Sequence, residues 1–502
     1  MTTAPLLGRV SGAVPWALVG KLVRFGSGIL TSVIVVRALG ADDYGILTLV
    51  RVTVAFLALP AGAGMGQALL RFLPELVVTR GGRGGRRLLA TGLLIQVAAW
   101  ALLALGVLLS RGWFDAFYKT DVSSFLLLAT ILLLVGSLRG FFESALTASY
   151  ETRLLAILGT FGSALLLSLT WLSVRSGFGI AGILVAAAVA DFVPALGAMA
   201  RAFSKHADTT REVPSRRLLA YSLPFVGLSL LNMITWKQSE TLLLGHFFSP
   251  REAGLFDLAY RLPQQLLEFV PETIWPLVLA AMSEAYTKNP GALKGLIDLY
   301  YRLLFLIIPP LSVFGMVLGD RFLAVLYGAE YREAGVYCQV LFGVFSLSFF
   351  GTPLSTAIYV LEKSWANFLL AFVFAVVNLG LDLILIPRYG LVGALIPVAI
   401  AIAISPIARW YALSRFIGPV AIPWGFIARA YRVSLPLLLL IPFRSRITDF
   451  ASLGAACAAA ALLVLGSIRL FGLLSAKEMD LIARSKLPMK GALLRVFAGS
   501  PA

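Results

Sequence analysis

Charged side chains lie inside stretches of the sequence that are otherwise apolar enough to cross a membrane. Lys21, Arg24 and Arg51 have no acid three or four positions away on their own predicted helices. A lipid-facing charge near mid-helix costs about 2.5–3.5 kcal/mol on insertion scales, so we expect these bases to face a wet cavity. Such a cavity favours an anion, and the arginine fork matches phosphate oxygens. The alternative is pairing with carboxylates of other helices, such as Asp191 or Asp257.

Other charges within the apolar stretches have partners at helical spacing. Arg139 and Glu143 are four residues apart, so we expect an ion pair on one helix face. Lys237 and Glu240 are three residues apart and can pair in the same way. A further stripe of charges predicts either a polar seam between helices or a cavity wall, and its members are Asp257, Arg261, Glu268 and Glu272.

Asn378 and Asp382 are four residues apart on one predicted helix and therefore share a face. A carboxylate and an amide oxygen make the start of a sodium or proton site, because hard cations prefer oxygen ligands. An amide–carboxyl pair that joins two helices is the alternative interpretation.

The sequence has no recognisable catalytic constellation. The only two histidines, His206 and His246, fall in loops that we expect on opposite sides of the membrane. There is no HExxH, P-loop or GxSxG motif, and no outer loop is long enough to build a polymerase or ligase site. We therefore predict a protein that is not an enzyme, with no cofactor and no bound metal.

The elements that must position these side chains are membrane helices. Of the 502 residues, 59% are hydrophobic and 13% charged, with a mean hydropathy of +0.90. We predict an all-α polytopic membrane protein with about 14 transmembrane helices of about 20 apolar residues or more. The predicted spans are 14–36, 43–66, 88–110, 123–147, 154–174, 178–200, 218–242, 254–282, 296–319, 335–361, 364–386, 391–414, 426–443 and 450–473.

The basic residues predict the orientation and account for the net charge of +17. The loops at 71–87 and 201–217 and the C-terminal tail are rich in these bases, and all three fall on one side of the predicted topology. About 21 bases fall on that side and about 10 on the other, which places both termini in the cytoplasm of a multi-pass inner-membrane protein and argues against nucleic acid as a partner. The tail is predicted to be a basic amphipathic helix on the membrane surface, with a frayed end as the alternative.

A weak internal repeat predicts the domain organisation. The turn at 39–46 (LGADDYGI) resembles the turn at 248–255 (FSPREAGL), and each has a glycine that opens a helix, with Arg51 or Arg261 about two turns later. Parallel repeats of six spans are one recurring transporter plan. We therefore expect lobes at 1–213 and 214–418, two extra helices at 419–474 and the tail at 475–502.

Three sequence stretches resemble motifs of one transporter family. They are Arg37–Gly45 (RALGADDYG), Leu326–Tyr331 (LYGAEY) and Asn378–Ala394 (NLGLDLILIPRYGLVGA). In this order they are similar to the oligosaccharide flippases of the polysaccharide biosynthesis family, which export O-antigen or exopolysaccharide repeat units. That family belongs to a superfamily that also holds lipid II flippases and multidrug exporters, and the likeness runs from about residue 14 to about residue 415.

The resemblance implies two six-helix bundles around a central cavity, working by alternating access. It implies that the substrate is an oligosaccharide linked to undecaprenyl diphosphate, that Na⁺ or H⁺ is the coupling ion, and that polysaccharide polymerases are candidate partners. Two alternatives stay open, a multidrug exporter of the same superfamily and an integral-membrane glycosyltransferase or polymerase.

The resemblance also implies roles for single residues. In the lipid II branch, arginines on the first, second and eighth helices bind the diphosphate, and Arg24, Arg51 and Arg261 lie at similar positions here, with Lys21 beside them. The same branch has a sodium site to which Asn378, Asp382 and Glu240 correspond. In that branch a residue of the twelfth helix adds a hydroxyl ligand to the sodium ion, and the corresponding position is apolar here. This difference weakens the case for Na⁺ and keeps H⁺ as the alternative coupling ion.

Overall fold

The computed structural model describes residues 4–62, 64–79, 85–149, 151–206, 215–235, 238–471 and 473, and every regular element in these ranges is a helix. Ten helices in this part of the chain are long and apolar enough to cross a membrane. Two of them, Gly20–Ala58 and Trp365–Ile417, are long enough to cross twice. Two more predicted spans coincide with α8 and α9 (218–242) and with α10 (254–282), so the helices agree with a total of about 14.

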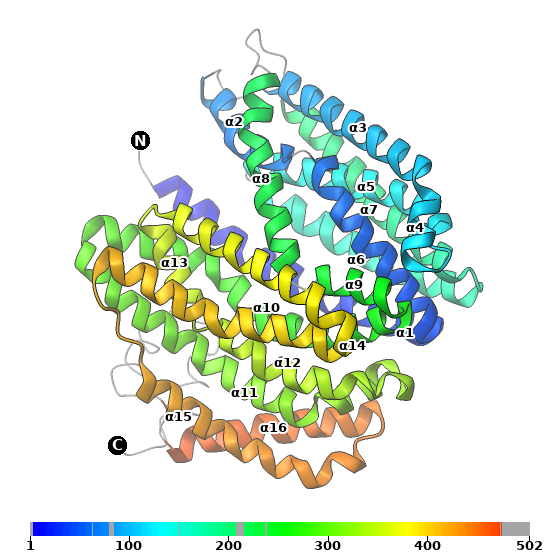
Figure 1. Ribbon diagram of the computed structural model, residues 1–502. Helices are drawn as coiled ribbons and strands as arrows, with labels where there is room; N and C mark the ends of the chain where they lie inside the picture. Colours follow the sequence, from blue (N-terminus) through cyan, green and yellow to red (C-terminus); the bar gives the residue numbers. More distant parts are fainter. Residues whose placement is uncertain are drawn as a thin grey trace. The chain divides into compact units, whose positions relative to one another are not determined.

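The chain divides into two compact units, Met1–Gly254 and Leu255–Ala502 (Figure 1). The boundaries of the two six-helix lobes and the two extra helices, at 1–213, 214–418 and 419–474, remain a prediction. The tail at 475–502 lies outside the described residues. The first unit contains α1 (Ala4–Gly62), α2 (Met65–Thr79), α3 (Arg86–Leu109), α4 (Arg111–Tyr118), α5 (Ser123–Ala148), α6 (Thr152–Arg175), α7 (Gly179–Lys205), α8 (Ser215–Thr235) and α9 (Gln238–Phe247).

Helix α10 (Pro250–Lys288) begins in the first unit and continues into the second. The rest of the second unit comprises η1 (Pro290–Ala292), α11 (Leu293–Tyr327), η2 (Ala329–Tyr331), α12 (Ala334–Ser348), α13 (Thr352–Val360), α14 (Ser364–Ile417), α15 (Trp424–Ser434), η3 (Leu435–Arg446) and α16 (Phe450–Phe471).

Two very long helices, α1 and α14, each turn a corner at a glycine. Gly40 has φ 74° and Gly390 has φ 54°, a region that residues with a Cβ rarely adopt. Gly40 lies between the spans predicted at 14–36 and 43–66, and Gly390 lies between those at 364–386 and 391–414. The prediction of two separate spans is therefore confirmed at both corners.

The first unit packs α5 against α7, α6 against both α1 and α7, and α3 against α5 (Figure 1). Its core is apolar and includes Met65, Leu69, Phe72, Leu89, Phe141, Phe142 and Leu218. Large apolar side chains also point outward, such as Leu109, which is 78% exposed. In water such a surface would be a liability, whereas in a bilayer it faces acyl chains.

The second unit packs α11 against α12 and α15, and α14 against α12 and α13. Its core includes Val317, Leu318, Leu437, Leu440 and Ala456. The span predicted at 426–443 is not one α-helix, because α15 ends at Ser434 and the chain continues as the 3₁₀ helix η3. Pro436 and Pro442 lack the N–H groups that an α-helix would need there.

The basic loop predicted at 71–87 begins later than expected. Helix α2 runs to Thr79 and includes Arg71, whose Nη1 lies 3.0 Å from Oε2 of Glu75 one turn on. An ion pair between residues four apart stabilises a helix, so α2 continues past the end of the apolar span predicted at 43–66.

The glycines of the two repeated turns meet in the first unit. A Cβ built on Gly45 would lie 2.0 Å from the carbonyl oxygen of Pro250, and one on Gly254 would lie 3.0 Å from the Cα of Gly45. Only residues without a side chain allow two backbones to approach this closely. The sequence likeness of the two turns therefore corresponds to a direct contact between them.

A polar cluster joins the corner between α5 and α6 to the end of α7. Glu151 Oε1 accepts hydrogen bonds from Lys205 Nζ at 2.7 Å and from Arg201 Nη2 at 2.8 Å. The hydrogen bond from Lys205, followed by that from Arg201, holds the pKa of the Glu151 carboxyl below its ordinary value. Beside it, Ser149 Oγ and His206 Nε2 are 3.1 Å apart.

Replacing Glu151 by Gln is expected to lower stability by about 0.5–1 kcal/mol at pH 7, because these pairs are partly exposed. Since the folded pKa is depressed, the stabilisation is fully present above the unfolded pKa of about 4.3 and is lost as pH falls through the lower folded value. Melting curves of the two purified proteins should thus differ at pH 7 and draw together as the pH falls below the unfolded pKa.

Glu284→Gln is the control for this experiment, since the Glu284–Lys288 pair is largely exposed at both side chains. Its melting temperature should equal that of the wild type across the pH range. A Glu151→Gln deficit that persisted undiminished at pH 3 would show that the carboxylate charge is not its source.

Candidate functional site

Arg24 lies half-buried between α1 and α6 in the first unit. A Cβ on Gly159 of α6 would lie 2.8 Å from Arg24 Nη1, and a Cβ on Gly20 would lie 3.2 Å from the same atom. The two glycines therefore make the room that the guanidinium fills. Among the residues that the structure describes, no carboxylate forms an ion pair with Arg24, so its pairing with an acid of another helix is not seen there.

The other predicted phosphate-binding bases have neighbours of their own. Lys21 lies one turn before Arg24 on α1, whereas Arg51 lies beyond the corner at Gly40; both make contacts with neighbouring groups. Arg261 belongs to α10 in the second unit, and its Nε is 3.6 Å from Oδ2 of Asp257. The structure thus places Lys21 and Arg24 one turn apart on the same helix.

The predicted ion-binding residues are all fully buried. In α14, Asn378 Nδ2 donates to Asp382 Oδ2 at 3.0 Å, as the spacing of four residues predicts. In α9, Glu240 Oε2 accepts from Ser239 Oγ at 3.1 Å. Glu240 belongs to the first unit and the α14 pair to the second; the neighbour suggested for Glu240, Lys237, lies outside the described residues. The described residues contain no cluster of three His, Cys, Asp or Glu side chains that could hold a metal.

Arg139 connects two carboxylates inside the first unit. Its Nε donates to Glu143 Oε1 at 2.8 Å, which confirms the pair predicted from their spacing. Its Nη1 donates to Asp191 Oδ1 on α7. Asp191, one of the carboxylates considered as partners for Lys21, Arg24 or Arg51, is thus paired with Arg139 instead.

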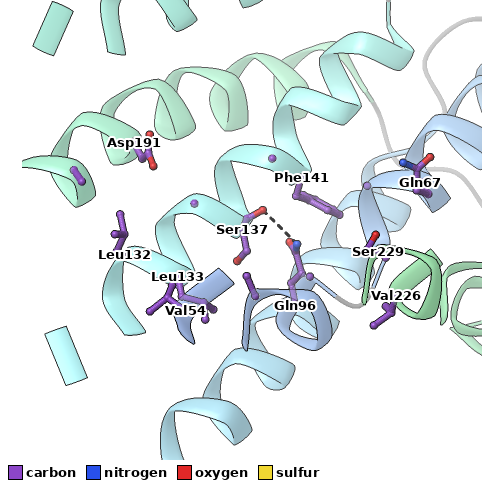
Figure 2. A pocket seen from close by; sticks show the side chains of 17 residues that line it. Val54, Gln67, Gln96, Leu132, Leu133, Ser137, Phe141, Asp191, Val226 and Ser229 are labelled. Atoms are coloured by element: carbon purple, nitrogen blue, oxygen red, sulfur yellow. Dashed lines mark hydrogen bonds between the residues drawn. The ribbon is translucent and has the colours of Figure 1, made fainter. Parts of the chain in front are cut away.

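A cavity of about 810 Å³ opens in the first unit, and Asp191 lies on its wall (Figure 2). The polar groups on the wall also include Gln67, Gln96, Ser137 and Ser229, from α2, α3, α5 and α8. Gln96 is not among the site residues predicted from the sequence. A single amide inside an otherwise apolar span was the signal that could have identified it, because burying an unpaired polar group is costly.

Comparison with protein families gives one match over more than half of the chain. The family described as "Polysaccharide biosynthesis protein" matches residues 34–335. A relative, the probable low-salt glycan biosynthesis flippase Agl15 of Haloferax volcanii, is 24% identical over 409 residues, which cover 78% of this chain and 81% of the relative.

Solved structures with the same fold are transporters. A lipid II flippase, MurJ, in its inward closed conformation has a TM-score of 0.72 at 15% identity, over 91% of this chain and 98% of the other. An inward-facing multidrug resistance transporter of the MATE family has a TM-score of 0.64 at 15% identity, over 80% and 98%. At these identities the likeness establishes the fold, and it confirms the predicted all-α polytopic class.

Proposed function

Because the chain belongs to the polysaccharide biosynthesis protein family, we propose that it is a flippase for an oligosaccharide linked to undecaprenyl diphosphate. It moves this lipid from the cytoplasmic to the outer leaflet of the inner membrane by alternating access, with both termini in the cytoplasm. It is a transporter and not an enzyme, as its relatives are flippases and transporters.

The observation that carries the proposal is Arg24. It is half-buried within a predicted membrane span, and no ion pair with a carboxylate compensates it in the described part of the chain. Such a charge is costly unless a ligand or water meets it, and a diphosphate supplies both negative charge and acceptor oxygens. Lys21 and Arg51, in the same unit as Arg24, are the proposed further contacts of the diphosphate.

Deleting the gene in its native host tests this function. Lipid-linked glycan should then accumulate on the cytoplasmic side, and surface polysaccharide should disappear. If the glycan chains stopped growing while their lipid-linked units still reached the outer leaflet, a polymerase would be indicated. If instead only resistance to cationic drugs changed, a multidrug exporter would be indicated, as the shared fold allows.

We propose that the buried pair of Asn378 and Asp382 serves ion coupling. Replacing Asp382 by Asn removes the titratable and charged oxygen but keeps the size, so transport driven by an imposed Na⁺ or H⁺ gradient should fall by about tenfold or more, an effect of about 1.4 kcal/mol. The measurement is glycan-lipid transport in proteoliposomes with each gradient imposed separately.

Asp298→Asn provides the control, since Asp298 is an exposed partner of Arg302, 2.7 Å away. This variant should transport like the wild type. Gradient-driven transport by Asp382→Asn at the wild-type rate would exclude the pair from coupling.

A further inference from the structure

The cavity of the first unit has the size of a ligand site. Its volume of about 810 Å³ lies within the range of about 300–1,000 Å³ that small-molecule sites occupy. Parts of its wall are bare backbone: no other atom of the described residues lies within 4 Å of a Cβ built on Gly62 or on Gly140. These glycines leave space that side chains would otherwise fill.

Gln96 is the most unusual group on this wall. Its side chain is only 3% exposed, and its Nε2 donates to the backbone carbonyl of Ser137 at 3.3 Å (Figure 2). Its Oε1 has no hydrogen-bond partner in the described part of the chain. An orphaned buried acceptor costs about 1–3 kcal/mol and calls for an explanation. The last torsion of a glutamine is soft, so the amide can turn its oxygen toward a ligand.

Asp191 adds a second acceptor on the same wall. Its Oδ1 accepts from Arg139, whereas its Oδ2 lies 3.9 Å from where a Cβ of Gly136 would be. Arg139 is shared with Glu143, so this cluster of one base and two acids has a formal charge of −1. Of this cluster only Asp191 lines the cavity, and the described lining holds no Lys, Arg or His. The wall therefore supplies no positive charge for a phosphate and offers acceptors that require hydrogen-bond donors.

We infer that this cavity binds sugar hydroxyls of the glycan, with Gln96 Oε1 and Asp191 Oδ2 as the acceptors. The inference rests on the proposed function and adds to it a site of glycan recognition separate from the diphosphate contacts. Hydroxyl groups suit this wall because they are neutral donors and because Arg139 already compensates much of the carboxylate charge, while the remaining polar groups, including Ser137 and Ser229, are neutral.

Two variants test the inference. Gln96→Leu removes the orphaned acceptor while keeping an apolar span, so it should fold at least as well as the wild type. Gly140→Leu places a side chain in the open space of the cavity. The matched control is Gly106→Leu. Gly106 is likewise an exposed helical glycine whose Cβ position has no atom of the described residues within 4 Å, but it lies outside the cavity wall.

The measurement is binding by the full chain in nanodiscs. One probe is labelled undecaprenyl diphosphate without sugar, and its competitor is the lipid-linked glycan pool extracted from native-host cells. The wild type should prefer the glycan lipid to the bare lipid. Gln96→Leu and Gly140→Leu should each lose about fivefold or more of this preference, about 1 kcal/mol, while their affinity for the bare lipid stays within about twofold, and Gly106→Leu should match the wild type.

The outcomes separate the inference from the function on which it rests. An unchanged glycan preference in both cavity variants would overturn the sugar site alone. Absence of binding of either lipid by the wild type would overturn the flippase proposal and the sugar site together. Loss of tetraphenylphosphonium binding in Gln96→Leu, with the glycan preference intact, would overturn the sugar site in favour of a cation site.

Discussion

Replacing Arg24 by Ala is expected to reduce glycan export by about 30-fold or more at normal protein levels. Removing a buried charge that makes hydrogen bonds to an oppositely charged ligand costs about 2–5 kcal/mol, and 2 kcal/mol corresponds to about 30-fold. Folding should be little affected, because no carboxylate is left without its partner among the described residues. Export is measured as surface polysaccharide in a deletion strain complemented with each variant.

Two further variants make this experiment specific. Arg24→Lys keeps the charge but loses the planar fork, so export should fall between that of the wild type and that of Arg24→Ala. Arg175→Ala is the control, since Arg175 is an exposed residue in the last turn of α6, stacked over Trp171, and its export should be unchanged. Normal export by Arg24→Ala at normal abundance would exclude Arg24 from the diphosphate site.

Replacing Gly45 by Val is expected to prevent folding. Even the Cβ alone would lie 2.0 Å from the carbonyl oxygen and 2.3 Å from the carbonyl carbon of Pro250. Backbone atoms of a packed helix start cannot move aside as a side chain can, so the loss of stability should exceed about 4 kcal/mol. The yield of monodisperse protein by size-exclusion chromatography should drop to background, and Gly45→Ala should show most of the same loss.

Gly28→Ala is the matched control on the same helix. A Cβ at Gly28 would meet no atom of the described residues within 4 Å, and alanine favours the helix over glycine by about 1 kcal/mol. This variant should be recovered at the wild-type yield or better. If Gly45→Ala were recovered with the wild-type yield and melting temperature, the close contact between the two turns would be wrong.

Hydropathy and length were enough to locate most helices. The spans predicted at 123–147 and 154–174 correspond to α5 and α6 within two residues at each end, because an apolar stretch of membrane length has few other structures open to it. The failures are local. In the span predicted at 426–443, prolines convert the second half to the 3₁₀ helix η3. In α2, the ion pair of Arg71 and Glu75 supports a helix that continues past the predicted end. Neither effect changes the average hydropathy from which spans are predicted.

The candidate sites were predictable only as far as they depend on one helix. The pairs Arg139–Glu143 and Asn378–Asp382 follow from a spacing of four residues. The contact of Arg139 with Asp191 joins residues far apart in the chain, so no local pattern predicts it. The lone amide of Gln96 in an apolar span is visible in the sequence, but the cavity that gives it a role is built from several helices and is not.

Transport by the purified protein in proteoliposomes tests the flippase activity itself. Lipid-linked glycan extracted from native-host cells is placed in the inner leaflet, and its arrival outside is followed with a membrane-impermeant glycosidase or lectin. The flippase account predicts arrival that requires the protein and is lost in Arg24→Ala. Glycan lipid that stays inside equally in protein-containing and protein-free vesicles, with an imposed Na⁺ or H⁺ gradient, would contradict it.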